Sequence, residues 1–217
     1  VNYGNQYYWF FSNGFKNVIW IDNYWTSTTP SYYANSAVIF NIGYGSMYHT
    51  DKNIPWMGQD MPYVWPVRGQ TASPAKLWRT GQTTSYYAGD DGDIQAGVGW
   101  PNPRFVDKGN GTITDKLTGL MWLKDTNCFG AQYIFQSSLD TISDFNANPS
   151  RFNCQDYTAS YPDWRLPNRK ELLSLIDYSS SDYFPPLGSL FIRSISDYYG
   201  SSTSMFNPWH FYCVGIN

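Results

Sequence analysis

Two stretches of the chain resemble each other, and this internal similarity limits how its domains can be arranged. Residues 23–29 read Asn-Tyr-Trp-Thr-Ser-Thr-Thr, and residues 197–203 read Asp-Tyr-Tyr-Gly-Ser-Ser-Thr. Residues 37–43 can likewise be laid on residues 209–215, at a distance of 172 positions. This alignment leaves residues 46–70 without a later counterpart, so the second copy of the repeat is shorter than the first.

The expected domain organisation follows from this alignment. Residues 78–174 have no counterpart earlier in the chain, and residues 71–76, Thr-Ala-Ser-Pro-Ala-Lys, have the composition of a linker. We therefore predict the C-terminal part of a first domain, a linker, and a second domain that lacks its last strands, at residues 1–70, 71–77 and 78–217 respectively.

Aromatic side chains must form most of the core. The sequence has 19 Tyr, 13 Phe and 10 Trp, whereas only 14% of its residues are charged, a composition that excludes a disordered chain. The net charge of -3 provides no basic field for a polyanion. No apolar run approaches the roughly 18 residues of a membrane span. We therefore expect neither nucleic-acid binding nor membrane insertion.

The second unit is predicted to contain a hairpin and two helices. Residues 104–107 and 112–115 flank the turn Lys-Gly-Asn-Gly, which is typical of a hairpin. Apolar residues at spacings of three and four between positions 131 and 145 predict an amphipathic helix. Asn168 and Glu171 have the spacing of a capping box, so a second helix begins there. With short strands elsewhere, the predicted fold class is α+β.

The cysteines indicate the compartment. Cys128, Cys154 and Cys213 allow at most one intrachain disulfide, and the first two bracket the first predicted helix. We expect Cys128 and Cys154 to pair in an oxidising compartment, the alternative being three buried thiols in a cytosolic domain. A surface built from Asn, Ser, Thr, Gly and Tyr also suits an extracellular protein.

Several motifs occur in the order and spacing of a known family. In the second unit they include Arg104-Phe105-Val106-Asp107, Thr118-Gly119-Leu120-Met121-Trp122, and Asp163-Trp164-Arg165-Leu166-Pro167-Asn168 followed by Glu171. In the first unit, residues 24–29 and 63–69 look like the closing half of the same pattern. The chain thereby resembles the Legionella collagen-like protein C-terminal domain family, in a tandem bacterial version. One departure is Tyr199-Gly200, where the family usually has Trp.

The resemblance implies C-type-lectin-like domains with short antiparallel strands and long loops, on a bacterial secreted or surface protein. Adhesion and glycan binding are the known role of the family's namesake. For the motif at residues 163–168, a structural role is favoured over a ligand site, with Trp164 packed and Arg165 paired to a carboxylate.

One loop has the chemistry of a calcium site. Asp90, Asp91 and Asp93 surround Gly92 and offer hard oxygen ligands, although the spacing is not that of an EF-hand and no bidentate Glu follows. The alternative is a solvated turn. Calcium is the one cofactor that the sequence suggests.

Catalysis finds little support in the sequence. His49 and His210 lie in different units, and the chain has no Gly-x-Ser-x-Gly, His-Glu-x-x-His or phosphate-loop motif. We therefore expect a protein that is not an enzyme.

Two functional hypotheses remain open. In the first, tandem domains assemble with other copies into an extracellular array or filament, because a domain without its last strands would expose a sheet edge that a neighbour could cover. The truncated repeat is explained equally well if the chain is an excerpt of a longer tandem polypeptide. In the second hypothesis, the same fold is a lectin-like adhesion module that binds glycans, with or without calcium.

Overall fold

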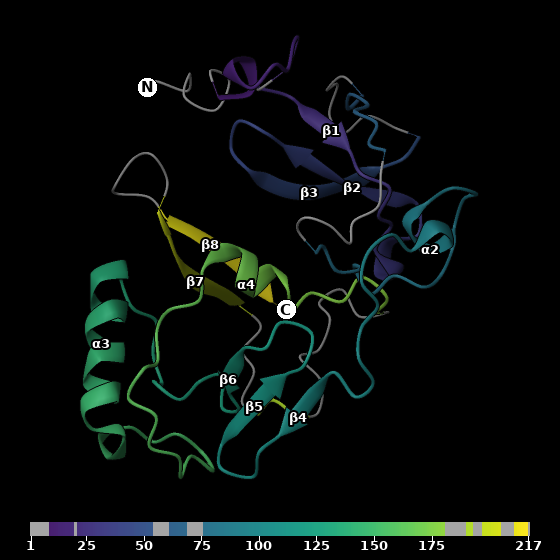
Figure 1. Ribbon diagram of the computed structural model, residues 1–217. Coiled ribbons are helices and arrows are strands. Elements are labelled where there is room, and N and C mark those ends of the chain that lie inside the picture. The colour runs from purple at the N-terminus through teal and green to yellow at the C-terminus, as the bar shows by residue number, and fades with distance from the viewer. Residues whose placement is uncertain are drawn as a thin grey trace. The chain divides into compact units, whose positions relative to one another are not determined.

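The computed structural model describes residues 9–19, 21–53, 61–68, 76–180, 190–192, 197–204 and 211–216. The chain forms two compact units (Figure 1). Unit 1 comprises residues 1–98 with 178–181, and unit 2 comprises residues 99–177 with 182–217. The division falls after Val98, later than the predicted linker, most of which lies outside the described residues.

Unit 1 is built on a three-stranded antiparallel sheet. Its strands β1 (Asn23–Trp25), β2 (Ser36–Asn41) and β3 (Ser46–Asp51) lie in the order β1-β2-β3. The central strand β2 has no charged residue and buries Ala37, Val38 and Ile39. A short 3-10 helix, η1 (Ser31–Tyr33), links β1 to β2.

A later segment of the chain completes unit 1. Asp91 begins the short helix α2 (Asp91–Ile94), and its carboxylate accepts hydrogen bonds from the hydroxyls of Thr28, at 2.9 Å, and Thr80, at 2.6 Å. The buried Gln82 donates from its amide to the carbonyl of Thr29. Because buried polar groups are costly unless they are paired, these contacts fix residues 80–91 to the first sheet.

Unit 2 contains the predicted hairpin, extended to a meander. Strands β4 (Phe105–Asp107), β5 (Thr112–Asp115) and β6 (Met121–Leu123) lie in that order and are antiparallel. Gly109 and Gly111 have φ of +70° and +79°, which explains the glycines of the turn. A second, two-stranded sheet pairs β7 (Asp197–Ser204) with β8 (Phe211–Ile216).

The helices of unit 2 agree with the sequence in type. Helix α3 (Phe135–Ala147) begins later than the apolar pattern does, and Phe145 is its one buried residue. A short 3-10 helix, η3 (Pro149–Arg151), follows it. Helix α4 (Arg169–Leu173) has the predicted capping box, with Asn168 as the N-cap. Small antiparallel sheets with a few helices confirm the α+β class.

The core of unit 2 joins the meander, α4 and the second sheet. Ile113 of β5 is fully buried and belongs to a cluster with Leu172 and Leu175, which lie at and just after the end of α4. Phe191, and Val214 from β8, complete the cluster. Segments far apart in the sequence thus depend on one core for their stability.

The internal similarity reappears in the strand pairing, with a corrected register. Tyr24 of β1 faces Phe40 of β2, and Tyr198 of β7 faces Gly215 of β8. Gly215 therefore takes the place of Phe40, so the predicted alignment of Gly215 with Gly43 is wrong. The error arose because a short apolar strand without charges can be matched to another in several registers.

Candidate interaction surfaces

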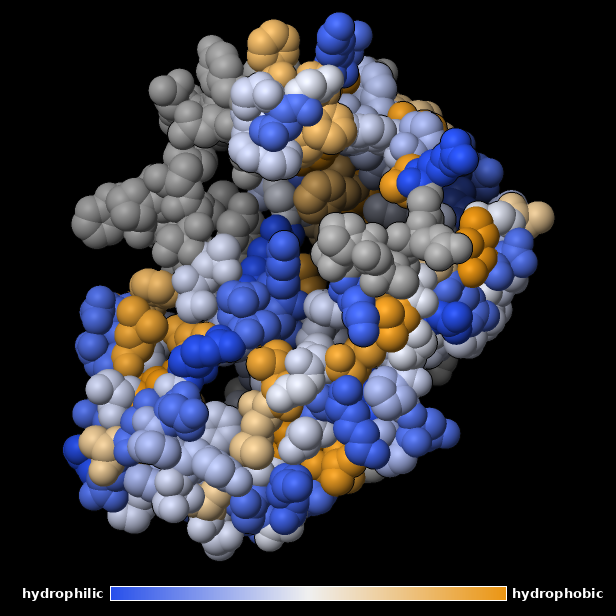
Figure 2. All heavy atoms as spheres, viewed as in Figure 1, coloured by the Kyte–Doolittle hydropathy of each residue, from blue (hydrophilic) through white to orange (hydrophobic). Residues whose placement is uncertain are grey.

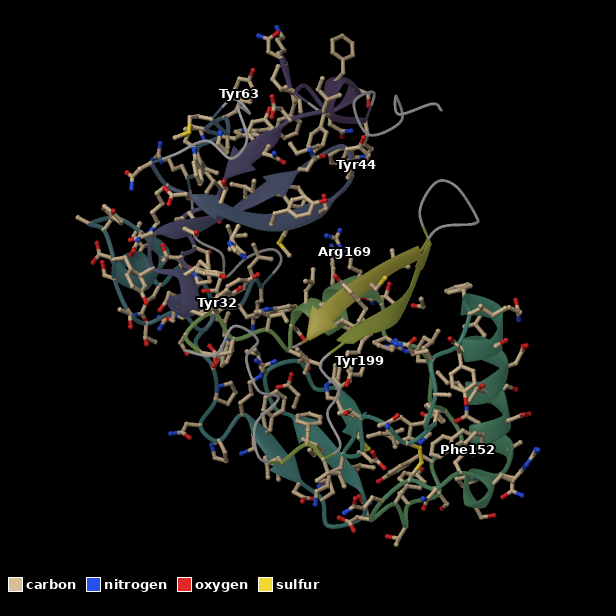
Figure 3. All side chains as sticks on the ribbon, turned by 180° about the vertical axis from the view of Figure 1, so that it is seen from behind. Tyr32, Tyr44, Tyr63, Phe152, Arg169 and Tyr199 are labelled. Carbon is tan, nitrogen blue, oxygen red and sulfur yellow. A yellow bond between two sulfur atoms is a disulfide. The ribbon has the colours of Figure 1, made fainter. Side chains whose placement is uncertain are left out.

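An aromatic cluster covers β1 in unit 1. Residues 61–68 run beside β1, where the amide of Trp25 donates to the carbonyl of Tyr63 at 2.9 Å. Tyr63 is labelled in Figure 3. The ring of Trp65 lies 5.5 Å from that of Tyr24, 5.5 Å from that of Phe15 and 5.7 Å from that of Phe10, measured between centroids. These contacts leave Tyr24 buried. The cluster fixes two segments, residues 9–15 and 61–68, on one sheet.

The same two segments expose apolar side chains, which we name the aromatic surface. Its exposed residues are Trp9, Phe11, Phe15, Tyr63, Val64, Trp65 and Val67. Val67 is 97% exposed and Val64 is 76% exposed. Apolar residues also reach the surface among hydrophilic ones on the face drawn in Figure 2. Grouped exposed apolar residues are typical of an interaction site, whereas isolated ones need no explanation.

An open pocket of about 300 Å³ lies in unit 1. Its lining residues are Trp25, Thr26, Ser27, Thr29, Ala37, Lys52, Tyr87, Ala88, Gly89 and Asp90. The ammonium of Lys52 lies 4.5 Å from the ring centroid of Tyr87 and donates to the carbonyl of Ala34 at 2.9 Å. Burial lowers the pKa of Lys52, although the negative charge of Asp90 opposes this shift. The pocket therefore combines aromatic rings, hydroxyls and a cation.

The predicted calcium ligands have other partners. The carboxylate of Asp90 accepts backbone hydrogen bonds from Tyr86, Tyr87 and Asp93, so it caps α2. Burial alone would raise the pKa of Asp90, but these hydrogen bonds lower it below its usual value. Asp91 binds hydroxyl groups, and Asp93 accepts from the amide of Gly89. Within the described ranges, no group of three or more acidic, His or Cys side chains could hold a metal ion.

The motif at residues 163–168 joins α4 to its neighbours. Arg165 makes a bidentate pair with Glu171, with nitrogen–oxygen distances of 2.8 and 2.6 Å. Hydrogen bonding to Arg165 lowers the pKa of Glu171, which also accepts from the amide of Asn168. The indole of Trp164 donates to the hydroxyl of Tyr157 at 3.0 Å. Arg165 and Trp164 thus both have side-chain partners within unit 2.

Other residues of the motif connect to the second sheet and to solvent. The carbonyl of Pro167 accepts from the amide of Ser202 in β7 at 2.8 Å. The amide of Arg169 donates to the hydroxyl of Thr203 at 3.0 Å. Leu166 is partly buried and Asp163 is exposed. The start of α4 is thus attached to β7.

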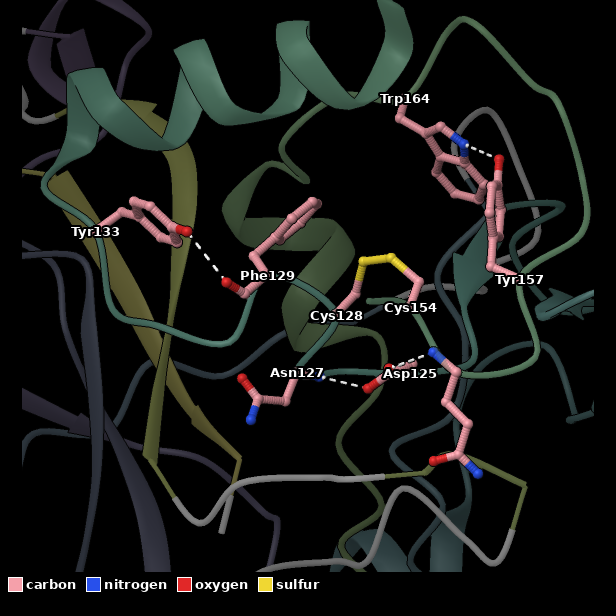
Figure 4. The surroundings of a disulfide bond; sticks show 9 residues. Asp125, Asn127, Cys128, Phe129, Tyr133, Cys154, Tyr157 and Trp164 are labelled. Atoms are coloured by element: carbon pink, nitrogen blue, oxygen red, sulfur yellow. Dashed lines mark hydrogen bonds between the residues drawn. A yellow bond between two sulfur atoms is a disulfide. The ribbon is translucent and has the colours of Figure 1, made fainter. Parts of the chain in front are cut away.

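Cys128 and Cys154 form the predicted disulfide (Figure 4). Beside it, the buried Asp125 accepts hydrogen bonds from the amides of Asn127, at 3.1 Å, and Gln155, at 2.8 Å. The ring of Phe129 packs edge-on against that of Phe145. The disulfide therefore closes a loop that contains α3 and ties the end of this loop to the segment that follows β6. Cys213 is an exposed free thiol.

Replacing both Cys128 and Cys154 by serine should destabilise unit 2 by about 3 kcal/mol, the loop-closure entropy for a loop of this length. The two cysteines are 26 positions apart. Thermal melts of the oxidised protein and of the double variant measure the difference, with Cys213→Ser as the control that should change little. Equal melts for the protein and the double variant would contradict this expectation.

Of the two histidines, the structure describes His49. His49 lies on β3 in unit 1, where burial lowers its pKa and its ring contacts Tyr33 at 4.8 Å. His210 lies outside the described residues. No helix in the part of the chain that the structure describes is long and apolar enough to cross a membrane.

Comparison with known proteins gives one match. Residues 111–217 match the family model of the Lcl C-terminal domain. No curated protein and no solved structure matches the chain. The matched segment begins at the hairpin turn and includes the disulfide, α4 and the second sheet.

Proposed function

We propose, from the match of residues 111–217 to the family model of the Lcl C-terminal domain, that the chain is a non-catalytic structural and adhesive protein that associates with other copies at the cell surface. The family is associated with surface proteins. A disulfide fits the oxidising extracellular environment. The proposed product of association is an array or filament of tandem domains.

The aromatic surface of unit 1 is the observation that supports association. Trp, Tyr and Phe bury large areas at interfaces and dominate their energetics. Val64 and Val67, in the same segment as Tyr63 and Trp65, add exposed aliphatic area. When a partner excludes water from a surface of this kind, the free energy falls because apolar area leaves water. The low content of charged residues weakens the repulsion between copies.

Sedimentation velocity over a range of concentrations tests this proposal. The chain should associate, and Val64→Asp with Val67→Asp should weaken association at least about tenfold, because a buried carboxylate at the interface has no partner. Ile94→Asp, at an exposed position of α2, is the matched control and should leave association unchanged. If the chain stays monomeric at every concentration, the proposed self-association is wrong.

The pocket of unit 1 favours glycan binding as a second candidate. Aromatic rings stack on the apolar faces of sugars, and the rings of Trp25 and Tyr87 stand at a pocket that also presents hydroxyls and Lys52. A glycan array with and without calcium, followed by Tyr87→Ala, tests this function. Tyr48→Ala, which changes an exposed tyrosine of β3, is the control. If Tyr87→Ala and Tyr48→Ala bind glycans equally well, any glycan site lies outside this pocket.

A further inference from the structure

The pocket of unit 1 contains charges of both signs. Of the residues that line it, Lys52 is positive, Asp90 is negative and the others are uncharged. Burial lowers the pKa of Lys52 and the negative charge of Asp90 opposes this shift, so the two charges act on each other. Beside the lining, the carboxylate of Asp93 accepts from the amide of Gly89 at 2.8 Å and adds a further negative charge. The pocket therefore has no excess of positive charge that would attract an anion.

The ammonium of Lys52 already has partners within unit 1. It donates to the carbonyl of Ala34 at 2.9 Å, and it lies 4.5 Å and 5.4 Å from the ring centroids of Tyr87 and Tyr86. The negative faces of aromatic rings attract a cation at such distances. An anionic ligand that bound Lys52 would have to compete with these contacts, so this lysine is a weak anchor for an acid.

The negative charge of Asp90 is fixed by the fold. Its carboxylate accepts from the amides of Tyr86, at 2.8 Å, Tyr87, at 3.1 Å, and Asp93, at 3.0 Å. Burial alone would raise the pKa of Asp90, but these hydrogen bonds lower it below its usual value, so the carboxylate is ionised at neutral pH. An acidic ligand in the pocket would lose part of its hydration beside a charge of the same sign, which is unfavourable.

The uncharged part of the lining suits a sugar ring. Tyr87 is 56% exposed although Lys52 contacts it, so much of its ring is accessible to a ligand. Trp25, Thr26 and Ser27 contribute an indole and two hydroxyls to the same pocket. Aromatic rings pack on the apolar C–H face of a pyranose, and hydroxyl groups exchange hydrogen bonds with its rim. None of these contacts needs a charge on the ligand.

We infer that this pocket selects an uncharged pyranose over an acidic one, and that Lys52 and Asp90 together determine this selectivity. The inference rests on the second proposed function, glycan binding by the pocket, and names the class of sugar. Lys52 positions the ring of Tyr87, and Asp90 cancels the attraction that Lys52 would otherwise exert on an acid.

Two matched sugars test the inference. Methyl β-glucoside and methyl β-glucuronide differ only in that a carboxylate replaces the hydroxymethyl group, and the corresponding galactose pair covers the other common configuration. Saturation-transfer NMR titrations of the whole chain should give a dissociation constant at least about fivefold lower for the neutral member of a pair. Binding of the neutral sugar should stay the same between about 0.01 M and 1 M NaCl, because screening acts on charges.

Charge variants should change the selectivity in opposite directions. Asp90→Asn keeps a good N-cap residue at the start of α2 and removes the negative charge, so the preference for the neutral sugar should fall at least about threefold. Lys52→Met removes the positive charge and should increase that preference. Tyr87→Ala should weaken binding of both sugars, whereas Tyr48→Ala on β3 should weaken neither. Thermal melts check that each variant is folded.

The outcomes separate the selectivity from the function. If the acidic sugars bind as tightly as the neutral ones, and Tyr87→Ala still abolishes binding, the pocket binds glycans but the inferred selectivity is wrong. The same conclusion follows if neither charge variant alters the ratio of the two dissociation constants. If no sugar of either pair binds, or if Tyr87→Ala has no effect, glycan binding by this pocket fails together with the inference.

Discussion

Replacement of Asp115 by alanine should lower the free energy of unfolding of unit 2 by about 3–5 kcal/mol, the cost of breaking a buried ion pair. Asp115 is fully buried, and its oxygens accept from the guanidinium of Arg104 at 2.9 and 2.8 Å. The hydroxyl of Thr118 and the amide of Leu117 bind the same carboxylate. Without Asp115, the positive charge of Arg104 stays buried with no counter-charge. Urea unfolding followed by tryptophan fluorescence measures the loss.

A matched variant in the same hairpin separates burial from charge. Asp107 pairs with Lys124 at 2.9 Å, but both side chains are partly exposed. Asp107→Ala should therefore cost less than about 1 kcal/mol, as is usual for surface ion pairs. If Asp107→Ala destabilised the protein more than Asp115→Ala, the buried pair would not be the main electrostatic support of this sheet.

The same carboxylate predicts how stability depends on pH. Burial alone would raise the pKa of Asp115, but hydrogen bonds from Arg104, Thr118 and Leu117 and the charge of Arg104 hold it below its ordinary value of 3.8. The stability that this group contributes is present above the unfolded-state pKa and is lost as the pH falls through the lower, folded-state pKa. Unfolding should become easier below about pH 4, and Asp115→Asn should flatten this dependence.

Local chemistry explains the parts of the fold that were predictable. The turn between β4 and β5 needs residues with positive φ, and glycines supply them at positions 109 and 111. The capping box of α4 involves groups only three residues apart, Asn168 and Glu171. Cys128 and Cys154 were the pair that bracketed a helix. In each case, the residues that determine the structure lie close together or on either side of one element.

The unpredicted parts depend on residues that meet only in the folded chain. Asp91 is a candidate calcium ligand in the sequence because its neighbours are acidic, and in the structure its carboxylate accepts hydrogen bonds from Thr80 and from Thr28, which lies on the other side of the predicted linker. Nothing in the sequence near residue 91 indicates that contact. Arg104 and Asp115 stand at opposite ends of a predicted hairpin, which was the one available signal for their pairing. The guanidinium of Arg104 also donates to the carbonyl of Ser174 at 2.7 Å, and only folding brings these two distant residues together.

Helix α4 provides the second large effect, because a cap and a core residue of the same short helix should differ in importance. Asn168→Ala removes the side chain that accepts from the amide of Glu171 at 3.0 Å. Loss of an N-cap costs about 1 kcal/mol. Leu172 is 4% exposed and packs in the cluster that contains Ile113 and Val214. Leu172→Ala leaves a cavity among these side chains and should cost about 2–5 kcal/mol.

Thermal or urea unfolding of the two variants, recorded side by side, compares these effects. Leu173→Ala is an informative third variant, because Leu173 packs against the same cluster while remaining only partly buried, so its cost should fall between the other two. The order Leu172, Leu173, Asn168 is expected because cavity formation depends on how many atoms surround the deleted group, whereas a lost cap exposes one amide that water can reach. If Asn168→Ala were the most damaging of the three, α4 would be held by its N-terminus rather than by the core that joins it to β5 and β8.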